Sequence, residues 1–474
     1  MPIKRVVAPR IDFSDLRREL HLPDGYPAAA LEEAAEAAAT PLPATDRTDV
    51  PFVTVDPPTS RDLDQALHLS RRPGGYRVRY AIADVAAYVR PGGPLEAETW
   101  VRGQTVYLPD GKVPLHPTVL SEDAVSLLPD ADRAAVLWMI DLDADGAIAA
   151  VELERARVRS RAKLDYAGVQ QAVDAGTAAE AVALLPEIGT LLAARAAARG
   201  AVNLPLPEQE VEPDGDGWRL TLRAPLPVEE HNAQISLLTG MAAATLMLGG
   251  GVGLLRTMPP PRPEAVEKLR AAAASLGVTW ADGASVGAVV SSVDPAGPRG
   301  AAFLMQAAEL LRGAGYTAFD GAAPEQTGHG GVGAPYAHVT APLRRLADRY
   351  ATEACLALHE GREVPGWVRE ALPRLPKTMA TTDRVASAAE RGAVSLAEAV
   401  LLAHRVGETF EAGVLDVDDP AEAGGKPRPA GGTVAIDEPA VQARCAGELP
   451  LGERIPVRLA EADPKTRTVR FEHP

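Results

Sequence analysis

The segment VTVDPPTSRDLDQALHL (Val53–Leu69) carries most of the information about this chain's fold and chemistry. It places Asp56, Asp62 and Asp64 within nine residues, between apolar alternations typical of strands. The two prolines after the first aspartate favour a rigid turn that brings the later carboxylates back toward it. Carboxylates so close together repel one another unless a cation lies between them, and hard oxygen ligands suit Mg²⁺ or Mn²⁺ rather than zinc. The alternative is a polar turn with helix-capping aspartates.

Composition limits the class of protein. The chain has 474 residues, of which 46% are hydrophobic, enough for one large domain with smaller additions. Its two cysteines, Cys355 and Cys445, lack metal-ligand spacing, which favours a reducing compartment without disulfides. The N-terminus lacks an apolar signal core, and no uninterrupted apolar run has membrane-spanning length. We therefore expect a soluble, cytoplasmic protein without membrane association.

The net charge of −16 opposes nucleic-acid binding, because an acidic surface repels phosphate, so such a function needs local basic tracks. One track is the alternating run ERARVRSRAK (Glu154–Lys163), whose five cations would share one face of a strand. A solvated face balanced by acidic neighbours explains the pattern equally well. Both interpretations stay open at this stage.

The order of predicted elements indicates an α+β fold. Residues 1–48 contain two short helical candidates, the first with Ser14 as its N-cap, and then a proline-containing linker. Strand patterns follow, and after them long helical patterns such as PEAVEKLRAAAASL (Pro263–Leu276). Strands followed by helices favour an α+β domain over an alternating parallel sheet. We expect an N-terminal helical module at 1–48, a large α+β domain at 49–405 and a third domain at 406–474.

The third domain shows five short strand patterns in about 65 residues, which fits a small OB-type barrel. Such barrels bind single strands through aromatic platforms and basic grooves. Phe410 and Phe471 are the only aromatic residues in this region, so a purely structural barrel is an equal alternative.

One motif competes for a metal role. DLDADGAIAAVE (Asp141–Glu152) satisfies the spacing of an EF-hand calcium loop. An EF-hand loop joins two helices, whereas both flanks here have strand patterns, and Asp-Gly between strands is typical of a hairpin turn. The context therefore favours a hairpin.

A second chemical element is AHVTAPLRRLADR (Ala337–Arg349). Thr340 is a good N-cap and a proline follows within the first turn, so we predict a helix that begins here. Arg344 and Arg345 would then lie near a helix N-terminus, where free amides and guanidinium groups together bind phosphate. Surface ion pairs with nearby acids are the alternative for both arginines.

These motifs, in this order, resemble the ribonuclease II / ribonuclease R family, the exoribonucleases built on the RNB domain. VDPPTSRDLDQALHL resembles the family's four-aspartate metal motif, HVTAPLRRLADR its arginine-bearing motif, and the stretch from Ile82 to Arg133 matches almost continuously. The resemblance runs over about residues 50–395. It implies an RNB-type catalytic domain that hydrolyses single-stranded RNA from the 3′ end to nucleoside 5′-monophosphates, with Mg²⁺ (or Mn²⁺) as cofactor. It also implies a monomer.

The resemblance assigns roles to individual residues. Asp56, Asp62 and Asp64 fall on the first three aspartates of the motif, and Asp64 on the one most closely tied to catalysis. Arg344 falls on the arginine that steadies the scissile phosphate. The remaining expected RNA contacts are Tyr107, which stacks on terminal bases, Tyr166, which helps to distinguish RNA from DNA, Glu390 near the substrate end, and Arg345.

The chain departs from the family pattern at several positions. The fourth aspartate is Gln65, whose amide oxygen can ligate a metal but lacks the charge that holds it tightly. Leu204 replaces a clamp phenylalanine, and Gln234 a glutamate near the terminal ribose. The N-terminal region is too short for two cold-shock barrels.

Two hypotheses follow. The first is an active magnesium-dependent exoribonuclease, and the second is an RNB-fold RNA-binding protein whose cleavage is weak or lost through Gln65 and the missing clamp. A phosphodiesterase that acts on small nucleotides or DNA is a remote third, which Tyr166 opposes.

Overall fold

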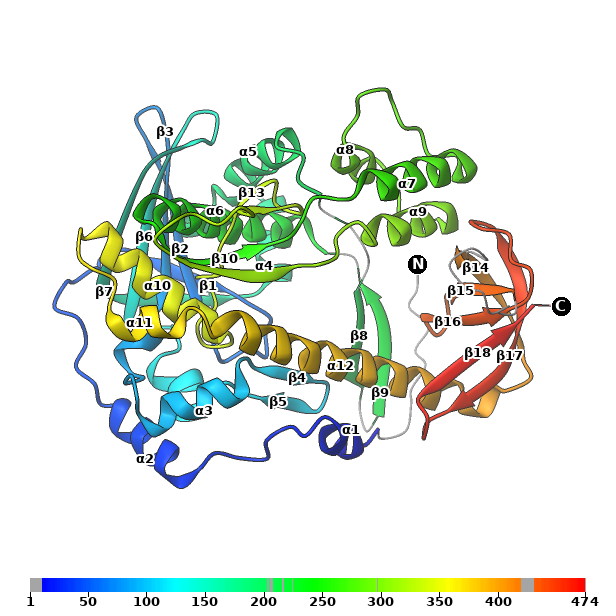
Figure 1. The fold of residues 1–474 in the computed structure, drawn as a ribbon, viewed down its shortest axis with the longest axis horizontal. Coiled ribbons are helices and arrows are strands. Elements are labelled where there is room, and N and C mark those ends of the chain that lie inside the picture. The colour runs from blue at the N-terminus through cyan, green and yellow to red at the C-terminus, as the bar shows by residue number, and fades with distance from the viewer. Residues whose placement is uncertain are drawn as a thin grey trace.

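The computed structural model describes residues 11–202, 204, 208–214, 217–223, 225–295, 297–418 and 430–473. Figure 1 shows a large body that holds most of the helices and strands, and a smaller β-barrel that contains the C-terminus. The long helix α12 (Leu375–Leu402) runs from the body to this barrel. Its 28 residues span about 42 Å, so one helix links the two parts of the molecule.

A closed five-stranded barrel forms the core of the large body. Its strands are β1 (Phe52–Val55), β2 (Gln65–Arg72), β3 (Gly75–Ala83), β6 (Asp132–Asp143) and β7 (Ile148–Leu164). The barrel closes because β1 pairs antiparallel with β2 and parallel with β7. Trp138 and Tyr80 are fully buried in the hydrophobic cluster that its strands share with the surrounding helices. The acidic segment between β1 and β2 therefore lies at one end of a packed barrel.

The hairpin between β6 and β7 settles the calcium-loop alternative. Gly146 takes a φ of 76°, and the Asp143 Oδ1 atom accepts hydrogen bonds from the amides of Asp145 and Ala147 at 3.0 and 2.8 Å. The carboxylate thus stabilises a turn between two paired strands. The predicted hairpin is confirmed.

The basic track on β7 is paired within the protein. Three of its arginines form ion pairs with acids from distant parts of the chain: Arg155 with Asp84 at 2.8 Å, Arg157 with Asp46 at 2.6 Å and Arg159 with Asp132 at 2.6 Å. Lys163 Nζ donates to the carbonyls of Pro58 and Ser60, both at 2.6 Å, and so braces the acidic loop. The structure favours the interpretation as a charge-balanced face.

Helices cover the barrel and share its core. They include α4 (Tyr166–Asp174), α5 (Leu185–Ala198), α6 (Pro227–Gly250), α10 (Leu346–His359) and α11 (Gly366–Ala371). Two helical stretches, Glu180–Ala198 and Pro227–Gly250, reach the length and apolar composition of a membrane span. Both pack into the main hydrophobic cluster, as core helices of globular domains do.

The remaining elements of the body are short. The helices are α3 (Pro94–Arg102), α7 (Pro263–Leu276), α8 (Val286–Ser291) and α9 (Pro298–Ala308). The strands are β4 (Val106–Leu108), β5 (Gly111–Val113), β8 (Glu208–Asp214), β9 (Gly217–Arg223), β10 (Val252–Thr257), β11 (Gly315–Asp320), β12 (Gly328–His329) and β13 (Ala334–Pro335). Single helical turns occupy Val85–Ala87, Leu120–Ala124, Glu180–Val182 and Ala403–Arg405.

The helix predicted to begin at Thr340 begins six residues later, at Leu346. Acidic side chains bind the amides of the residues before the helix. The Ala341 amide donates to Asp348 Oδ2, and the Leu343 amide to Asp64 Oδ1, both at 2.7 Å. The residues before α10 therefore form a turn that is fixed against the acidic segment.

The C-terminal domain is a closed barrel with strand order β14-β15-β16-β18-β17, which confirms the predicted OB-type fold. Its strands are β14 (Thr409–Val417), β15 (Gly431–Ile436), β16 (Val441–Ala446), β17 (Arg454–Asp463) and β18 (Thr468–Glu472). Phe410 and Phe471 pack edge to face in its core, with ring centroids 5.9 Å apart. Neither aromatic is an exposed stacking platform.

The N-terminal segment forms α1 (Ser14–Glu19) and α2 (Ala28–Ala37). The predicted N-cap, Ser14, is the first residue of α1, and Phe13 takes the cap position. Phe13 is fully buried, edge to face with Trp218 at 5.6 Å, so tertiary packing determines where the helix begins. The domain boundaries proposed from the sequence stay a prediction.

Candidate functional site

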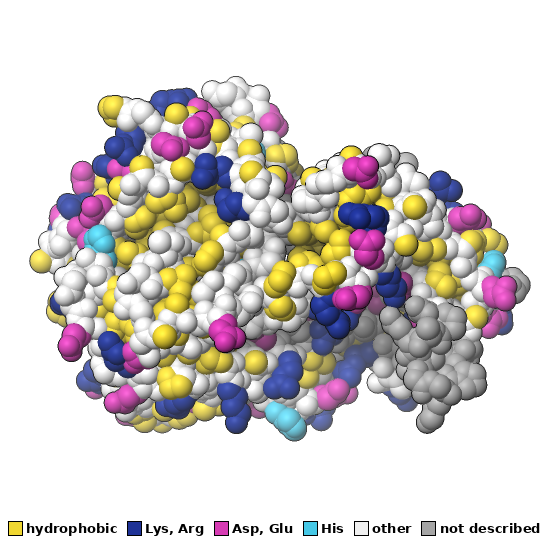
Figure 2. All heavy atoms as spheres, turned by 45° about the horizontal axis from the view of Figure 1, so that its top comes forward, with side chains coloured by type: hydrophobic (Ala, Val, Ile, Leu, Met, Phe, Trp, Pro, Cys, Tyr) yellow, Lys and Arg dark blue, Asp and Glu magenta, His cyan; other side chains and the backbone are white. Residues whose placement is uncertain are grey.

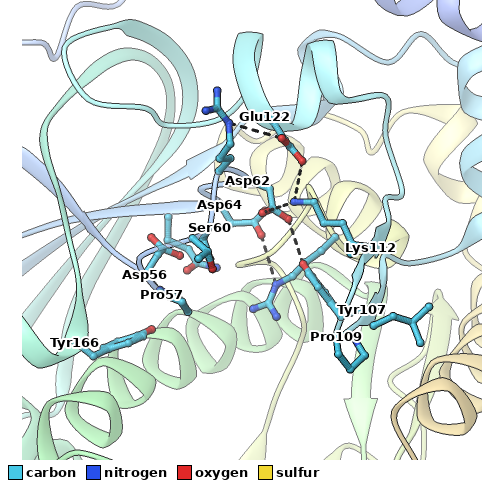
Figure 3. A pocket seen from close by; sticks show the side chains of 16 residues that line it. Asp56, Pro57, Ser60, Asp62, Asp64, Tyr107, Pro109, Lys112, Glu122 and Tyr166 are labelled. Atoms are coloured by element: carbon cyan, nitrogen blue, oxygen red, sulfur yellow. Dashed lines mark hydrogen bonds and ion pairs between the residues drawn. The ribbon is translucent and has the colours of Figure 1, made fainter. Parts of the chain in front are cut away.

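A pocket of about 660 Å³ opens at the end of the first barrel. Its size is that of a small-ligand site. The predicted site residues that line it are Asp56, Asp62, Asp64, Gln65, Tyr107, Tyr166 and Arg344. Figure 3 shows the three aspartates between Tyr166 on one side and Tyr107 on the other. Segments more than 250 residues apart in the chain thus meet at one site.

Asp64 is the most buried acid of the site, with 3% of its surface exposed. Its Oδ1 atom accepts the Leu343 amide at 2.7 Å, and its Oδ2 atom lies 3.5 Å from Arg344 Nε. Burial raises the pKa of the Asp64 carboxyl to about 8, although Arg344 and the amide act in the opposite direction. Burial thus outweighs the nearby guanidinium and disfavours the charged form of this carboxyl.

Asp56 follows β1 directly, and its amide donates to the Leu164 carbonyl at 3.0 Å, which extends the pairing with β7. Burial raises the pKa of its carboxyl to about 6, against the effects of Arg344 and Lys163. Two buried carboxyls with raised pKa values thus lie in one pocket, in a setting that a bound cation would stabilise.

Asp62 forms an ion pair with a lysine of the pocket. Lys112 Nζ lies 2.7 Å from Asp62 Oδ1 and 3.1 Å from Glu122 Oε1, and the Tyr107 hydroxyl donates to Asp62 Oδ2 at 3.1 Å (Figure 3). Tyr107 and Lys112 are cross-strand partners in the β4–β5 hairpin, so both side chains come from the same face. Sequence reasoning missed Lys112 and Glu122, whose only sequence cue is the Asp-Gly turn before the lysine.

Gln65 is the first residue of β2 and reaches across the site. Its side-chain nitrogen donates a hydrogen bond to the Thr340 carbonyl. Because that contact is made by the amide NH₂ group, an aspartate could not make it. Compared with an aspartate, Gln65 therefore removes one negative charge from the acidic loop. It also adds a hydrogen bond between this loop and the turn before α10.

The two neighbouring arginines have different environments. Arg344 has a side chain that is 47% exposed and faces the pocket. Arg345 is directed away from it and forms a two-point ion pair with fully buried Asp348, at 2.9 and 3.0 Å. Burial alone would lower the pKa of Arg345, but Asp348 raises it. Arg345 thus forms the ion pair that was the alternative for it, Arg344 lines the pocket, and RNA contacts of both stay a prediction.

Three other positions named from the sequence lie outside the pocket lining. Gln234 is half-buried on α6, and Glu390 is exposed on α12. Leu204 packs against the hydrophobic cluster of α7, α8 and α9 rather than beside Tyr107. Contacts of these residues with RNA stay a prediction.

The donor chemistry of the pocket fits a divalent cation. Asp56 and Asp64 offer hard oxygen ligands, and burial raises the pKa of both carboxyls, so a cation bound between them would stabilise their charged forms. Within the described ranges, however, no three His, Cys, Asp or Glu side chains come close enough together to hold a metal. The metal set Asp56, Asp62, Asp64 and Gln65 therefore stays a prediction, with Asp62 engaged by Lys112.

The fold and the pocket define a two-barrel α+β protein with an acid-lined site beside an arginine and two tyrosines. The profile of the RNB domain matches residues 44–358, and that of the RNase II-type exonuclease C-terminal S1 domain matches residues 408–473. The chain belongs to the RNB domain family. The resemblance inferred from the sequence is confirmed.

Two relatives show moderate sequence identity to this chain. The chain is 31% identical to the exosome complex exonuclease RRP44 homolog A of Arabidopsis thaliana over 62% of this chain, and 28% identical to ribonuclease R of Escherichia coli over 67%. It spans 33% and 41% of the length of these two relatives.

Solved structures agree in fold. Mycoplasma genitalium RNase R in complex with ribose methylated single-stranded RNA aligns with a TM-score of 0.82 at 19% identity, over 96% of this chain and 77% of that one. Yeast Ssd1, a pseudonuclease, aligns with a TM-score of 0.68 at 17% identity, over 90% and 53%. The same fold therefore occurs in a ribonuclease and in a pseudonuclease.

Proposed function

We propose that this chain is a magnesium-dependent 3′-to-5′ exoribonuclease that hydrolyses single-stranded RNA to nucleoside 5′-monophosphates. The observation that carries the proposal is the pocket itself, in which Asp56, Asp64 and Arg344 meet between Tyr107 and Tyr166. Membership of the RNB domain family and the printed names of the relatives support the same reaction.

Each side chain has a task in this proposal. Arg344, half exposed beside Asp64, binds the non-bridging oxygens of the scissile phosphate and stabilises their charge during transfer. Tyr107 stacks on a base near the 3′ end, and Tyr166 lies near Asp56 where it can contact a ribose. Asp56 and Asp64 would hold the divalent cation, which, when bound, would activate water and neutralise the departing oxygen.

Single-strand selectivity follows from base stacking, because a paired base cannot lie on an aromatic side chain. The net charge of −16 does not exclude this substrate. Figure 2 shows acidic and basic side chains interspersed over one face of the molecule, and the proposal assigns RNA binding to the local cations of the pocket.

The second candidate is an RNB-fold RNA-binding protein with weak or lost cleavage. Two observations favour it: Gln65 uses its amide to hold the Thr340 carbonyl, and Asp62 is neutralised by Lys112. Both reduce the negative charge available to a metal. The retention of Asp56, Asp64 and Arg344 in one pocket favours the enzyme.

The deciding experiment is a gel time course on 5′-labelled single-stranded RNA with Mg²⁺, with a chelator, and with the Asp64→Asn variant. Successive shortening that needs both the metal and Asp64 supports the enzyme. Measurable RNA binding without any cleavage supports the second candidate. A matched single-stranded DNA of the same sequence tests the expected preference for RNA.

We further propose that the protein acts as a monomer in the cytoplasm and prefers Mg²⁺ to Mn²⁺. The low cysteine content supports a reducing compartment. Sedimentation with and without RNA tests the monomer, and side-by-side titration of the two metals tests the preference.

A further inference from the structure

The β4–β5 hairpin determines where the stacking tyrosine lies. Its two three-residue strands place Tyr107 opposite Lys112, and both side chains reach Asp62, at 3.1 and 2.7 Å. An isolated hairpin of this size is not stable in water, so something else must hold it. The N-terminal segment, which lies outside the range matched by the RNB profile, contacts it directly.

Two polar contacts join the N-terminal segment to the two ends of the hairpin. Arg17 Nη2 on α1 lies 2.7 Å from Asp110 Oδ1 at the hairpin turn. The Tyr26 hydroxyl donates to the Pro114 carbonyl, just after β5, at 2.6 Å. Arg102, which is buried, stacks over the Tyr26 ring at 3.7 Å and donates to the same Pro114 carbonyl at 3.1 Å.

Apolar packing covers the other side of the hairpin. One buried cluster combines side chains of the N-terminal segment, the hairpin and α12: Ile11, Phe13, Leu16, Val106, Leu108, Val113, Ala389, Ala393 and Ala397. Leu16 fills the space beside Gly392 of α12, where an added Cβ would come within 2.7 Å of it. The hairpin is therefore held between α1 and α12, as Figure 1 shows.

Lys112 connects this packing to the acidic pocket. It lines the pocket that contains Asp64, and it also lines a second pocket of about 150 Å³ beneath the N-terminal segment, together with Arg17 and Tyr26. A shift of the N-terminal segment would thus move the lysine that neutralises Asp62 and the tyrosine across the strand from it.

We propose that residues 11–26 are a positioning element for the RNA 3′ end: they brace the β4–β5 hairpin and thereby fix Tyr107 and Lys112 against Asp62. This inference rests on the proposed function. Residues 11–26 themselves contact neither Asp64 nor Arg344 and act through the hairpin on Tyr107 and Lys112, so at saturating Mg²⁺ their loss weakens the hold on the terminal nucleotide more than the hydrolytic step. When the brace is lost, we expect KM to rise, kcat to remain nearly unchanged, and the final RNA product to become longer.

A charge exchange between Arg17 and Asp110 tests the brace. The variants are Arg17→Asp, Asp110→Arg and the double exchange, with the milder Arg17→Gln in case a charge reversal prevents folding. Arg18→Asp is the matched control, because Arg18 is the next residue of α1 and its 78% exposed side chain pairs only with surface Asp15 among the described residues. Steady-state kinetics on single-stranded RNA and gel analysis of the end product are the readouts.

Each single exchange should raise KM about fivefold, with kcat changed less than about twofold. The double exchange should restore KM and product length, and Arg18→Asp should change neither. Unchanged KM and product length in the folded single variants would overturn the proposal. So would a folded double variant that behaves like the single ones.

Hydrogen exchange of the amides at 104–114, measured without RNA, separates this proposal from the proposed function. Faster exchange in the single variants and recovery in the double variant support the brace even if the wild-type chain cleaves nothing. Equal exchange in all variants would overturn the brace even if the chain is an active exoribonuclease.

Discussion

Lys112 is the cation whose removal tests the electrostatics of the pocket most directly. Its ammonium lies 2.7 Å from Asp62 Oδ1 and 3.1 Å from Glu122 Oε1. The side chains of Lys112, Asp62 and Glu122 are 21%, 10% and 22% exposed, so Lys112 forms two ion pairs that are both largely shielded from solvent. The Lys112→Met variant keeps the length of the side chain and removes the charge.

The cost to stability lies between two known limits. Exposed ion pairs contribute about 0.2–1 kcal/mol, whereas removal of one partner from a fully buried pair costs about 3–5 kcal/mol. With two partners at this exposure, we expect Lys112→Met to lower the free energy of unfolding by about 2 kcal/mol. Urea denaturation in the presence of a chelator measures it, and Lys112→Arg is the control that keeps the charge.

The same variant should bind metal more tightly. Without the ammonium, the Asp62 carboxylate becomes available beside Asp56 and Asp64, and we expect the affinity for Mn²⁺ to rise about tenfold by calorimetry on RNA-free protein. A metal present at about 100 times its Kd adds about 2.7 kcal/mol to the folded state, so saturating Mn²⁺ should offset the loss in stability. Unchanged stability together with unchanged Mn²⁺ affinity would refute the reasoning.

Four further variants test other parts of the site. Gln65→Asp should raise Mg²⁺ affinity severalfold in calorimetry, because it restores a carboxylate; equal affinity would mean that position 65 does not contact the metal. Arg345→Ala should lower the free energy of unfolding by about 3–5 kcal/mol, because it leaves buried Asp348 unpaired, while Arg344→Ala should cost less than about 1 kcal/mol. Similar urea midpoints for the two variants would contradict that difference. Tyr166→Phe should reduce the ratio of RNA to DNA affinity in matched binding titrations, and an unaltered ratio would remove Tyr166 from sugar recognition.

Local sequence signals were sufficient to predict a helix or strand where residues within or next to the element mark its ends. The helix predicted at Pro263–Leu276 is α7 with the same two ends. Proline at its first position and Gly277, with a φ of 71°, after its last residue mark those ends in the sequence. The strands of the C-terminal barrel were predictable for a similar reason, since alternation specifies a half-buried strand.

Boundaries that depend on distant residues could not be read from the sequence. The turn before α10 has good helix-start residues, yet the helix begins only at Leu346, and Asp64 and Asp348 bind the amides of the turn. The same applies to the arginines of β7, whose partners come from loops far away in the chain. Spacing reveals which residues share a face, but not which charges lie opposite that face.

The acidic motif was predictable as a cluster, but not the charge balance around it. Gln65 lowers the negative charge of the loop by one unit relative to an aspartate, and Lys112 cancels the charge of Asp62. Both differences act in the same direction, because they reduce the repulsion that a phosphate meets as it approaches Asp64. Because the chain carries a net charge of −16, local neutralisation at the pocket matters to the approach of RNA. Weaker metal binding would then accompany easier access for RNA, and the rise in Mn²⁺ affinity expected for Lys112→Met follows from the same charge balance.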